Sequence, residues 1–222
     1  MIKIIVPILF LISCSKSNTN PPAPHNVKDS LFVNFDSTQT QTVANGWTNA
    51  TGDPHFNRFT TTSTSGLITF QSAVIGNYIP FAGNCAYPGN GNTSYTAFPS
   101  QVVKEIWYSY NDNTGGHNYD LYDSTKPKGR FSGLKTAKTY KVVIGGSLDS
   151  TFATFVCVTS YHVKGTLASL NGEIHYNCQN NTATVATFTG VIPSGSGTID
   201  IYFNAFVGND IAIGTAVQIW EE

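Results

Sequence analysis

Aromatic rings beside amide-rich loops are the residues of this chain best suited to molecular recognition. Rings are denser between residues 78 and 122 than elsewhere, and several flank loops rich in Gly and Asn. A sugar can stack the apolar C–H face of its ring on an aromatic side chain while neighbouring amides and carboxylates bond its hydroxyl groups. The sequence therefore predicts a saccharide-binding surface built from Trp107, Tyr108, Tyr110, Asn111, Asp112, Asn113, Trp47 and Tyr119. The alternative interpretation is that these rings pack in the core, where aromatic side chains are common.

The centre of this predicted surface is the run Trp107-Tyr108-Ser109-Tyr110, which precedes the polar loop from 111 to 118. In a strand, Trp107 and Ser109 face one way while Tyr108 and Tyr110 face the other; in a helix, Trp107 and Tyr110 share a face. Either geometry directs at least one ring away from the core. That outward ring, with an amide or carboxylate of the loop beside it, is the predicted stacking platform.

Acid–base chemistry has one weaker candidate. Glu173 and His175 stand two residues apart and would share a strand face, with His162 as a third member if it lies opposite them. Solvent-facing strand residues are the favoured interpretation. No Gly-x-Ser-x-Gly turn for a nucleophile and no Cys-x-x-Cys spacing for zinc occurs, and the loop around Asp112 lacks the bidentate Glu of a calcium loop. We therefore predict a domain that is not an enzyme, with no cofactor and no metal.

Three cysteines follow Cys14, namely Cys85, Cys157 and Cys178, so at least one of them is left without a partner among the three. Cys157 and Cys178 fall in or beside predicted strands and are close enough in sequence to pair. A disulfide requires Cα atoms within about 7 Å, and two buried free thiols fit the sequence equally well. The sequence leaves the pairing open.

The elements that must position these groups are strands. Charged residues make up only 11% of the chain, Glu is rare, and Thr, Asn and Gly are abundant, a mixture that suits pleated surfaces and turns rather than helices. We predict one all-β domain over 31–222, an antiparallel two-sheet β-sandwich of jelly-roll type. Residues 101–110 carry apolar side chains at helical spacing behind Ser100, which allows one short helix.

Residues 129–147 give the clearest element pair. Arg130 to Leu134 is predicted to end one strand, and Tyr140 to Ile144 to form the next, which stops at Gly145-Gly146. We expect a hairpin-like unit here. Further strands are predicted at 31–35, 66–70, 72–75, 152–163, 166–170, 173–177, 183–191, 198–203 and 211–220.

The first thirteen residues combine one early Lys with an apolar run too short to span a bilayer. Their end, Leu11-Ile12-Ser13-Cys14, resembles the lipobox of bacterial lipoproteins. The resemblance implies a signal peptide over 1–13, lipid on Cys14, and a location as an outer membrane lipoprotein at the cell surface or in the periplasm. Residues 14–30, rich in Ser, Asn and Pro, are predicted to form a flexible tether. The alternative is a secreted protein in which Cys14 is incidental.

Several short stretches between residues 31 and 220 share a recognisable pattern. They are Val33-Asn34-Phe35, Gly46-Trp47-Thr48-Asn49, Phe98-Pro99 with 102–107, Phe131-Ser132-Gly133-Leu134, Thr139-Tyr140, Gly146-Ser147, Asn180-Asn181-Thr182, 188–193 and 197–201. Together they resemble a group of galactose-binding-domain-like, carbohydrate-binding-module-like jelly rolls found in secreted bacterial proteins, alone or beside glycan-active enzymes. The resemblance implies an accessory glycan-binding domain. Asn34 stands where that group has Asp, Thr48 where it has Asn, and Leu148 where it has Arg.

The formal net charge is −1, and the basic residues are scattered, so no nucleic-acid partner is expected. We predict a surface-anchored, non-catalytic lipoprotein that binds an oligo- or polysaccharide and contacts the membrane through its lipid only. The alternatives are a hydrolase of glycans or glycan esters, and a structural or adhesive protein with a protein partner. Asp36, Asp123 and Asp149 each begin an Asp-Ser-Thr sequence, which resembles a bacterial O-glycosylation signal. Turn chemistry explains these sites equally well.

Overall fold

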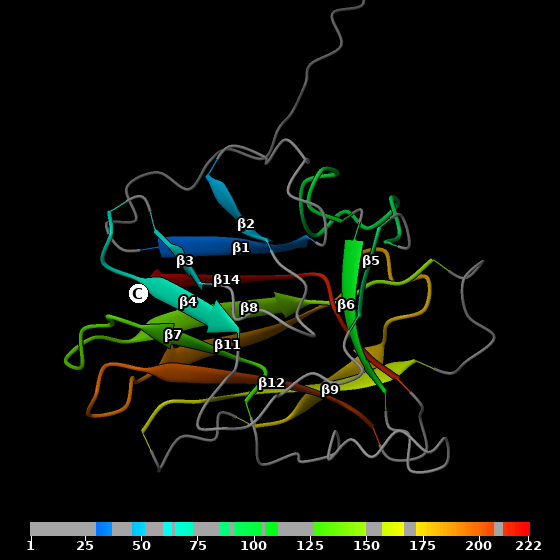
Figure 1. The fold of residues 1–222 in the computed structure, drawn as a ribbon. Helices are drawn as coiled ribbons and strands as arrows, with labels where there is room; N and C mark the ends of the chain where they lie inside the picture. Colours follow the sequence, from blue (N-terminus) through cyan, green and yellow to red (C-terminus); the bar gives the residue numbers. More distant parts are fainter. Residues whose placement is uncertain are drawn as a thin grey trace, which may run out of the picture.

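The protein is seen in a computed structural model whose described residues form an all-β fold without a helix (Figure 1). The described residues are 30–36, 46–51, 60–63, 65–72, 85–88, 91–103, 105–110, 127–149, 157–166, 172–206 and 211–222. The predicted signal peptide and nearly all of the predicted tether lie outside these ranges. The predicted β-sandwich is confirmed, because two mostly antiparallel sheets of five and six strands make up most of the described fold.

The five-stranded sheet joins the beginning and the end of the domain. Its order is β11 (Val185–Val191), β8 (Tyr140–Gly145), β14 (Ala216–Glu221), β1 (Ser30–Asp36) and β2 (Trp47–Thr51). Neighbouring strands are antiparallel except β1 and β2, which run parallel. The central strands β8, β14 and β1 are rich in β-branched, aromatic and other apolar residues, which suit strands with a buried face.

The six-stranded sheet is antiparallel throughout its described pairs. Its order is β10 (Ile174–Asn177), β9 (Val158–Lys164), β12 (Ile199–Ala205), β7 (Gly129–Ser132), β4 (Thr69–Ser72) and β3 (Thr60–Thr62). The chain crosses between the two sheets from β7 to β8, β8 to β9, β10 to β11 and β11 to β12. Repeated crossing of this kind is compatible with the predicted jelly-roll type.

A third, three-stranded sheet has the order β13 (Ile211–Gly214), β6 (Glu105–Tyr110) and β5 (Cys85–Pro88). Figure 1 shows β5 and β6 running almost at right angles to β1 and β14 at one end of the sandwich. The strand β13 is joined to β14 through Thr215, whose N–H donates to the Gly145 carbonyl at 2.7 Å. One predicted strand, 211–220, is therefore two strands that belong to different sheets.

Two further predictions are wrong. Residues 101–103 form a turn and 105–110 form β6, so the helical spacing of 101–110 does not produce a helix. Sheet pairing outweighs the local pattern there, because β6 hydrogen bonds to β5 on one side and β13 on the other. The strands β7 and β8 are at the predicted places but lie in different sheets, so they form no hairpin.

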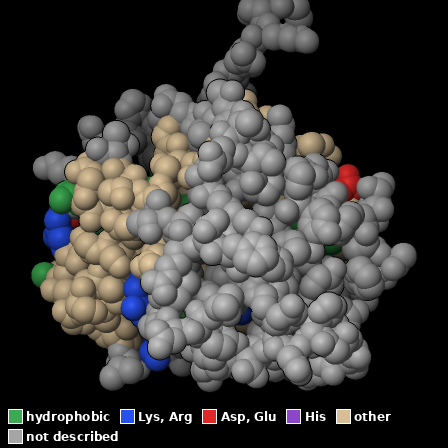
Figure 2. Space-filling model, viewed as in Figure 1, with side chains coloured by type: hydrophobic (Ala, Val, Ile, Leu, Met, Phe, Trp, Pro, Cys, Tyr) green, Lys and Arg blue, Asp and Glu red, His purple; other side chains and the backbone are tan. Residues whose placement is uncertain are grey.

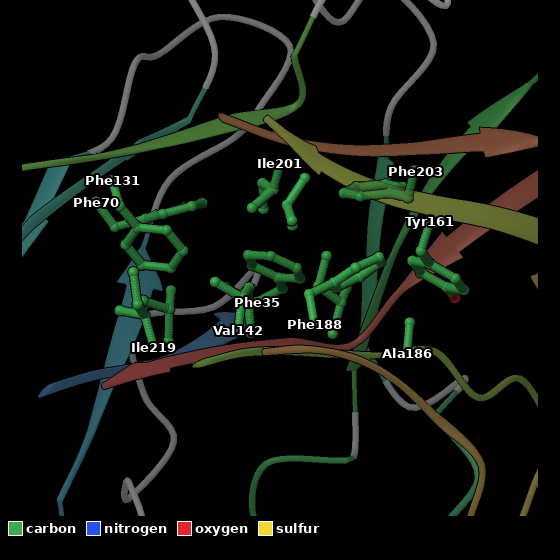
Figure 3. Packing of buried hydrophobic residues seen from close by; sticks show 14 of the residues in the cluster. Phe35, Phe70, Phe131, Val142, Tyr161, Ala186, Phe188, Ile201, Phe203 and Ile219 are labelled. Atoms are coloured by element: carbon green, nitrogen blue, oxygen red, sulfur yellow. The ribbon is translucent and has the colours of Figure 1, made fainter. Parts of the chain in front are cut away.

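The core fills the space between the two large sheets (Figure 3). Strand alternation supplies it: in β11, Ala186 and Phe188 are buried while Thr187 between them is exposed. Aromatic rings from both sheets meet, with Phe35 and Phe70 6.0 Å apart and Phe70 and Phe131 5.0 Å apart between centroids. This packing fixes which side chains must point outward, and those outward side chains form the surfaces described next.

Candidate functional site

Side chains that alternate away from the core give the five-stranded sheet an aromatic outer surface. Phe32 lies between core residues of β1 and points to the opposite side of the sheet. The strand register places it level with Trp47 of β2 and with Gln218 of β14. Trp220, two residues after Gln218, shares this side and is paired with Lys141 of β8. We call Phe32, Trp47, Lys141, Gln218 and Trp220 the outer face.

Three rings run across the outer face from β2 to β14. The ring of Phe32 lies 5.5 Å from that of Trp47, tilted by 51°, and 6.0 Å from that of Trp220, with an edge-on angle of 79°. Phe32 is buried, with 8% of its surface exposed, whereas both indoles are partly exposed. The buried phenyl ring therefore holds two indoles in fixed, tilted orientations from which they reach the solvent.

Segment 91–103 packs over the neighbouring part of the same sheet. Its Phe98 contacts Trp47 edge-on at 5.5 Å between ring centroids and Tyr95 at 5.6 Å. Phe98 lies where a side chain at Gly145 would stand, and Gly145 is paired with the small residue Ala216. The small residues Gly145 and Ala216 thus leave room for segment 91–103, which borders the outer face beside Trp47.

The loop 180–184 fastens this segment. The Asn92 amide donates to the Asn181 carbonyl at 3.0 Å, and the Thr96 N–H donates to the Thr182 carbonyl at 2.7 Å. Tyr95 donates its hydroxyl to the Thr184 carbonyl at 2.8 Å. Burial raises the pKa of Tyr95 well above its ordinary value, so the hydroxyl keeps the proton that this bond uses. The border of the outer face is therefore rigidly attached.

Polar groups lie beside the rings. The Lys141 ammonium stands 5.2 Å from the centre of the Trp220 ring, a cation–π distance. Gln218 is partly exposed next to Phe32. On the adjacent row, Asn34 donates its amide to Asn49 at 3.1 Å, and its own Oδ1 is buried without a hydrogen-bond partner in the described part of the chain. Hydrogen-bonding side chains thus lie beside the aromatic row, which consists of Trp47, Phe32 and Trp220.

The structure places only part of the sequence-predicted surface. Trp47 lies on the outer face, as part of an aromatic cluster. Trp107, Tyr108 and Tyr110 lie in β6, the strand alternative of the two predicted geometries, but their side chains are outside the description. The predicted residues Asn111, Asp112, Asn113 and Tyr119 lie outside the described residues altogether.

Four outer-face residues escaped the sequence prediction: Phe32, Lys141, Gln218 and Trp220. Alternation within 31–35 and 216–221 shows that Phe32 and Trp220 each face away from their apolar neighbours. What the sequence does not show is that β1 pairs with β14, because that pairing joins opposite ends of the domain.

The outer side of the six-stranded sheet carries the acid–base candidates. Glu173 and His175 share this side, as predicted, because Ile174 and Tyr176 pack against the core. Continuing the β9–β10 register places Glu173 opposite His162 and His175 opposite Ser160. Ser160 donates a hydrogen bond directly to Glu173.

The His162 imidazole packs against an aromatic ring of the neighbouring strand β12. It stacks on the ring of Tyr202 at 4.3 Å between centroids and 11° between planes. Ser160 therefore bonds to the carboxylate without an intervening imidazole, unlike a nucleophile that a histidine activates. Burial lowers the pKa of His162, and the charge of Glu173 opposes that effect only in part.

Acidification should destabilise the domain through His162. Its pKa in the folded protein lies below the ordinary value of 6.5, so the unfolded chain takes up the proton more readily. Above pH 6.5 His162 is neutral in both states and does not lower the free energy of unfolding. As the pH falls through 6.5, protonation of the unfolded chain lowers that free energy. Urea unfolding at pH 8, 6 and 5 should show a shallower decline for His162→Gln than for the parent. Equal declines in the two proteins would contradict this assignment.

No three His, Cys, Asp or Glu side chains among the described residues are grouped so that they could hold a metal ion. The described strands and loops also include no helix that is long and apolar enough to cross a membrane. Lys and Arg side chains visible in Figure 2 lie at separate places on the left and lower parts of the face, apart from one another.

No protein-family model matches the chain, and no curated protein matches it.

Proposed function

We propose that the domain binds saccharides, without catalysis, on the outer face of the five-stranded sheet. The observation that carries the proposal is the pair of partly exposed indoles, Trp47 and Trp220, held on either side of the buried Phe32 ring. Indoles offer large, rigid surfaces for the C–H face of a sugar ring. The Gln218 amide and the Lys141 ammonium stand beside them and can bond sugar hydroxyl groups.

The shape of this surface favours a chain of sugars over a single one. The two indoles belong to strands separated by β1, so they are spaced across the sheet rather than stacked on each other. Adjacent strands lie about 4.8 Å apart, which makes the aromatic row longer than one sugar ring. The ligand we propose is therefore an oligo- or polysaccharide that crosses β14, β1 and β2, bordered by Phe98 next to Trp47.

Trp220→Ala and Trp47→Ala should each weaken binding about tenfold, because each removes one stacking surface. A glycan array probed with the unlipidated chain identifies the ligand, and calorimetry then measures its affinity for each variant. Phe206→Ala is the matched control, because Phe206 is an exposed aromatic residue directly after β12 of the six-stranded sheet. If both Trp variants bind the glycan like the parent, the ligand lies elsewhere, and the segment from Trp107 to Tyr110 becomes the next candidate.

We also propose that the domain is held at a bacterial membrane by lipid on Cys14. The basis is the lipobox-like end of the leader together with a Pro- and Ser-rich stretch before β1 starts at Ser30. Cys14→Ser should move the protein from the detergent phase to the aqueous phase in a partition experiment, because only a thiol there accepts the lipid. Equal partition of parent and variant would contradict the anchor and leave the saccharide proposal untouched.

A further inference from the structure

Two cysteines face each other at the end of the β9–β10 ladder. Cys157 comes directly before β9, and Cys178 comes directly after β10. The last registered pair is Val158 with Asn177, so one further step of the antiparallel ladder sets Cys157 opposite Cys178. The Cys178 N–H donates to the Cys157 carbonyl at 2.8 Å, which shows that the two backbones still run side by side at this point.

Both side chains point the same way, into the core. Each cysteine is fully buried and belongs to the main hydrophobic cluster, while the preceding pair, Val158 and Asn177, faces the opposite side of the sheet. Directly opposed residues of a hydrogen-bonded antiparallel pair have Cα atoms about 5.5 Å apart. Disulfides span Cα separations of about 4.4 to 6.8 Å, so this pair needs no movement of the backbone to be joined.

The two thiols are already in contact, and both are reduced in the structure. A hydrogen bond with Cys178 raises the pKa of Cys157, and burial raises it further. For Cys178, burial acts in the same direction, but hydrogen bonds with Cys157, Thr159 and Tyr161 outweigh it and hold the pKa below its ordinary value. The Tyr161 hydroxyl and the Thr159 Oγ1 each lie 3.2 Å from the Cys178 sulfur.

We propose that Cys157 and Cys178 form a disulfide when the chain folds in the presence of a disulfide oxidant. A first cysteine thiolate attacks the oxidant, forms a mixed disulfide and releases one thiolate. The thiolate of the other cysteine then attacks the cysteine sulfur of the mixed disulfide, forms the bond between Cys157 and Cys178 and releases the second thiolate. The cysteines lose two electrons, the oxidant gains them, and the two protons pass to the released thiolates.

The position of the pair sets the timing and the effect of this reaction. Both sulfurs are buried in the folded domain, so oxidation precedes the docking of the two sheets, and a reductant cannot reach the finished bond. The bond ties the short edge strand β10 to β9. It also fixes the start of the loop 180–184, because the Cys178 carbonyl accepts from Leu148 and Asn181. That loop holds the segment that borders the outer face. The inference does not depend on saccharide binding.

Refolding the unlipidated chain with glutathione disulfide, and in parallel with dithiothreitol, tests the proposal. After alkylation of remaining thiols, mass spectrometry of a digest made without reductant should find one linked peptide pair containing Cys157 and Cys178, two hydrogens lighter than the free peptides. Cys85 should be alkylated in both samples. The oxidised protein should melt about 6 to 12 °C above the reduced one, because closing this loop restricts the unfolded chain.

Cys157→Ala and Cys178→Ala should each remove the linked peptide and the difference in melting temperature between the two refolding conditions. The parent digest decides the question even if a variant fails to fold. Alkylation of both cysteines after refolding with glutathione disulfide, or a linkage of either one to Cys85, would overturn the proposal.

Discussion

Gly133→Ala should leave little folded domain, whereas Gly172→Ala should lower the free energy of unfolding by only about 1 to 2 kcal/mol. Both glycines adopt positive φ, at +79° and +73°, so both substitutions strain the backbone in the same way. They differ in what surrounds them. A Cβ at Gly133 would collide with the backbone carbonyl oxygen of Leu67, while a Cβ at Gly172 would meet nothing within 4 Å.

The collision at Gly133 cannot be relieved by a side-chain rotation. The obstructing atom is backbone just before β4, and Leu134, the residue after Gly133, donates its N–H to the Gly197 carbonyl at 3.1 Å. Moving either segment disturbs the six-stranded sheet, so the added cost should exceed about 4 kcal/mol, a large part of the stability of an ordinary domain. Urea unfolding of the two variants measures the difference, and equal midpoints would show that the close approach of Leu67 is not a constraint.

Asn181→Ala should lower the free energy of unfolding by about 3 kcal/mol. The Asn181 amide donates to the carbonyls of Gly146 and Thr184 at 2.9 and 2.7 Å, and its Oδ1 accepts from the N–H groups of Thr184 and Ala183 at 2.8 and 3.2 Å. The Thr184 carbonyl would keep its bond to the Tyr95 hydroxyl, but the carbonyl of the buried Gly146 and two loop N–H groups would lose the bonds that Asn181 makes to them. Thr182→Ala is the control: its side chain is exposed, and its change should stay within about 0.5 kcal/mol.

Loss of the Asn181 side chain should also loosen the segment 91–103, which borders the outer face. The loop 180–184 provides the carbonyls that hold Asn92, Tyr95 and Thr96, and therefore the segment that carries Phe98. Amide hydrogen exchange of Thr96 should become faster in Asn181→Ala at a urea concentration where the variant is still folded. Unchanged exchange at Thr96 would mean that this loop does not hold the segment.

Local sequence patterns predict the positions of many of the strands. The β-branched run from Tyr140 to Ile144 is β8, the alternation after 183 is β11, and the apolar run at 31–35 is β1. In each, propensity and burial favour the same conformation. At 101–110 they disagree, since the spacing of apolar residues is helical while the Trp and Tyr content suits the strand that forms.

Pairing between distant strands is what the sequence does not show. The break at Thr215 depends on its bond to Gly145, and the aromatic row depends on β14 lying between β8 and β1. Neither arrangement leaves a local signal, because the partner strands lie far apart in the sequence. For that reason the sequence predicts Trp47 as a binding residue but does not predict Phe32 and Trp220, which complete its surface.

The indole N–H resonances of the three tryptophans provide the most direct test of saccharide binding on the outer face. In a titration of the ¹⁵N-labelled, unlipidated chain with the glycan identified on the array, Trp47→Phe and Trp220→Phe assign the signals. The signals of Trp47 and Trp220 should shift together with one affinity, while that of Trp107 stays in place. A titration in which Trp107 shifts and the other two do not would contradict the outer face as the binding surface and favour the segment of β6.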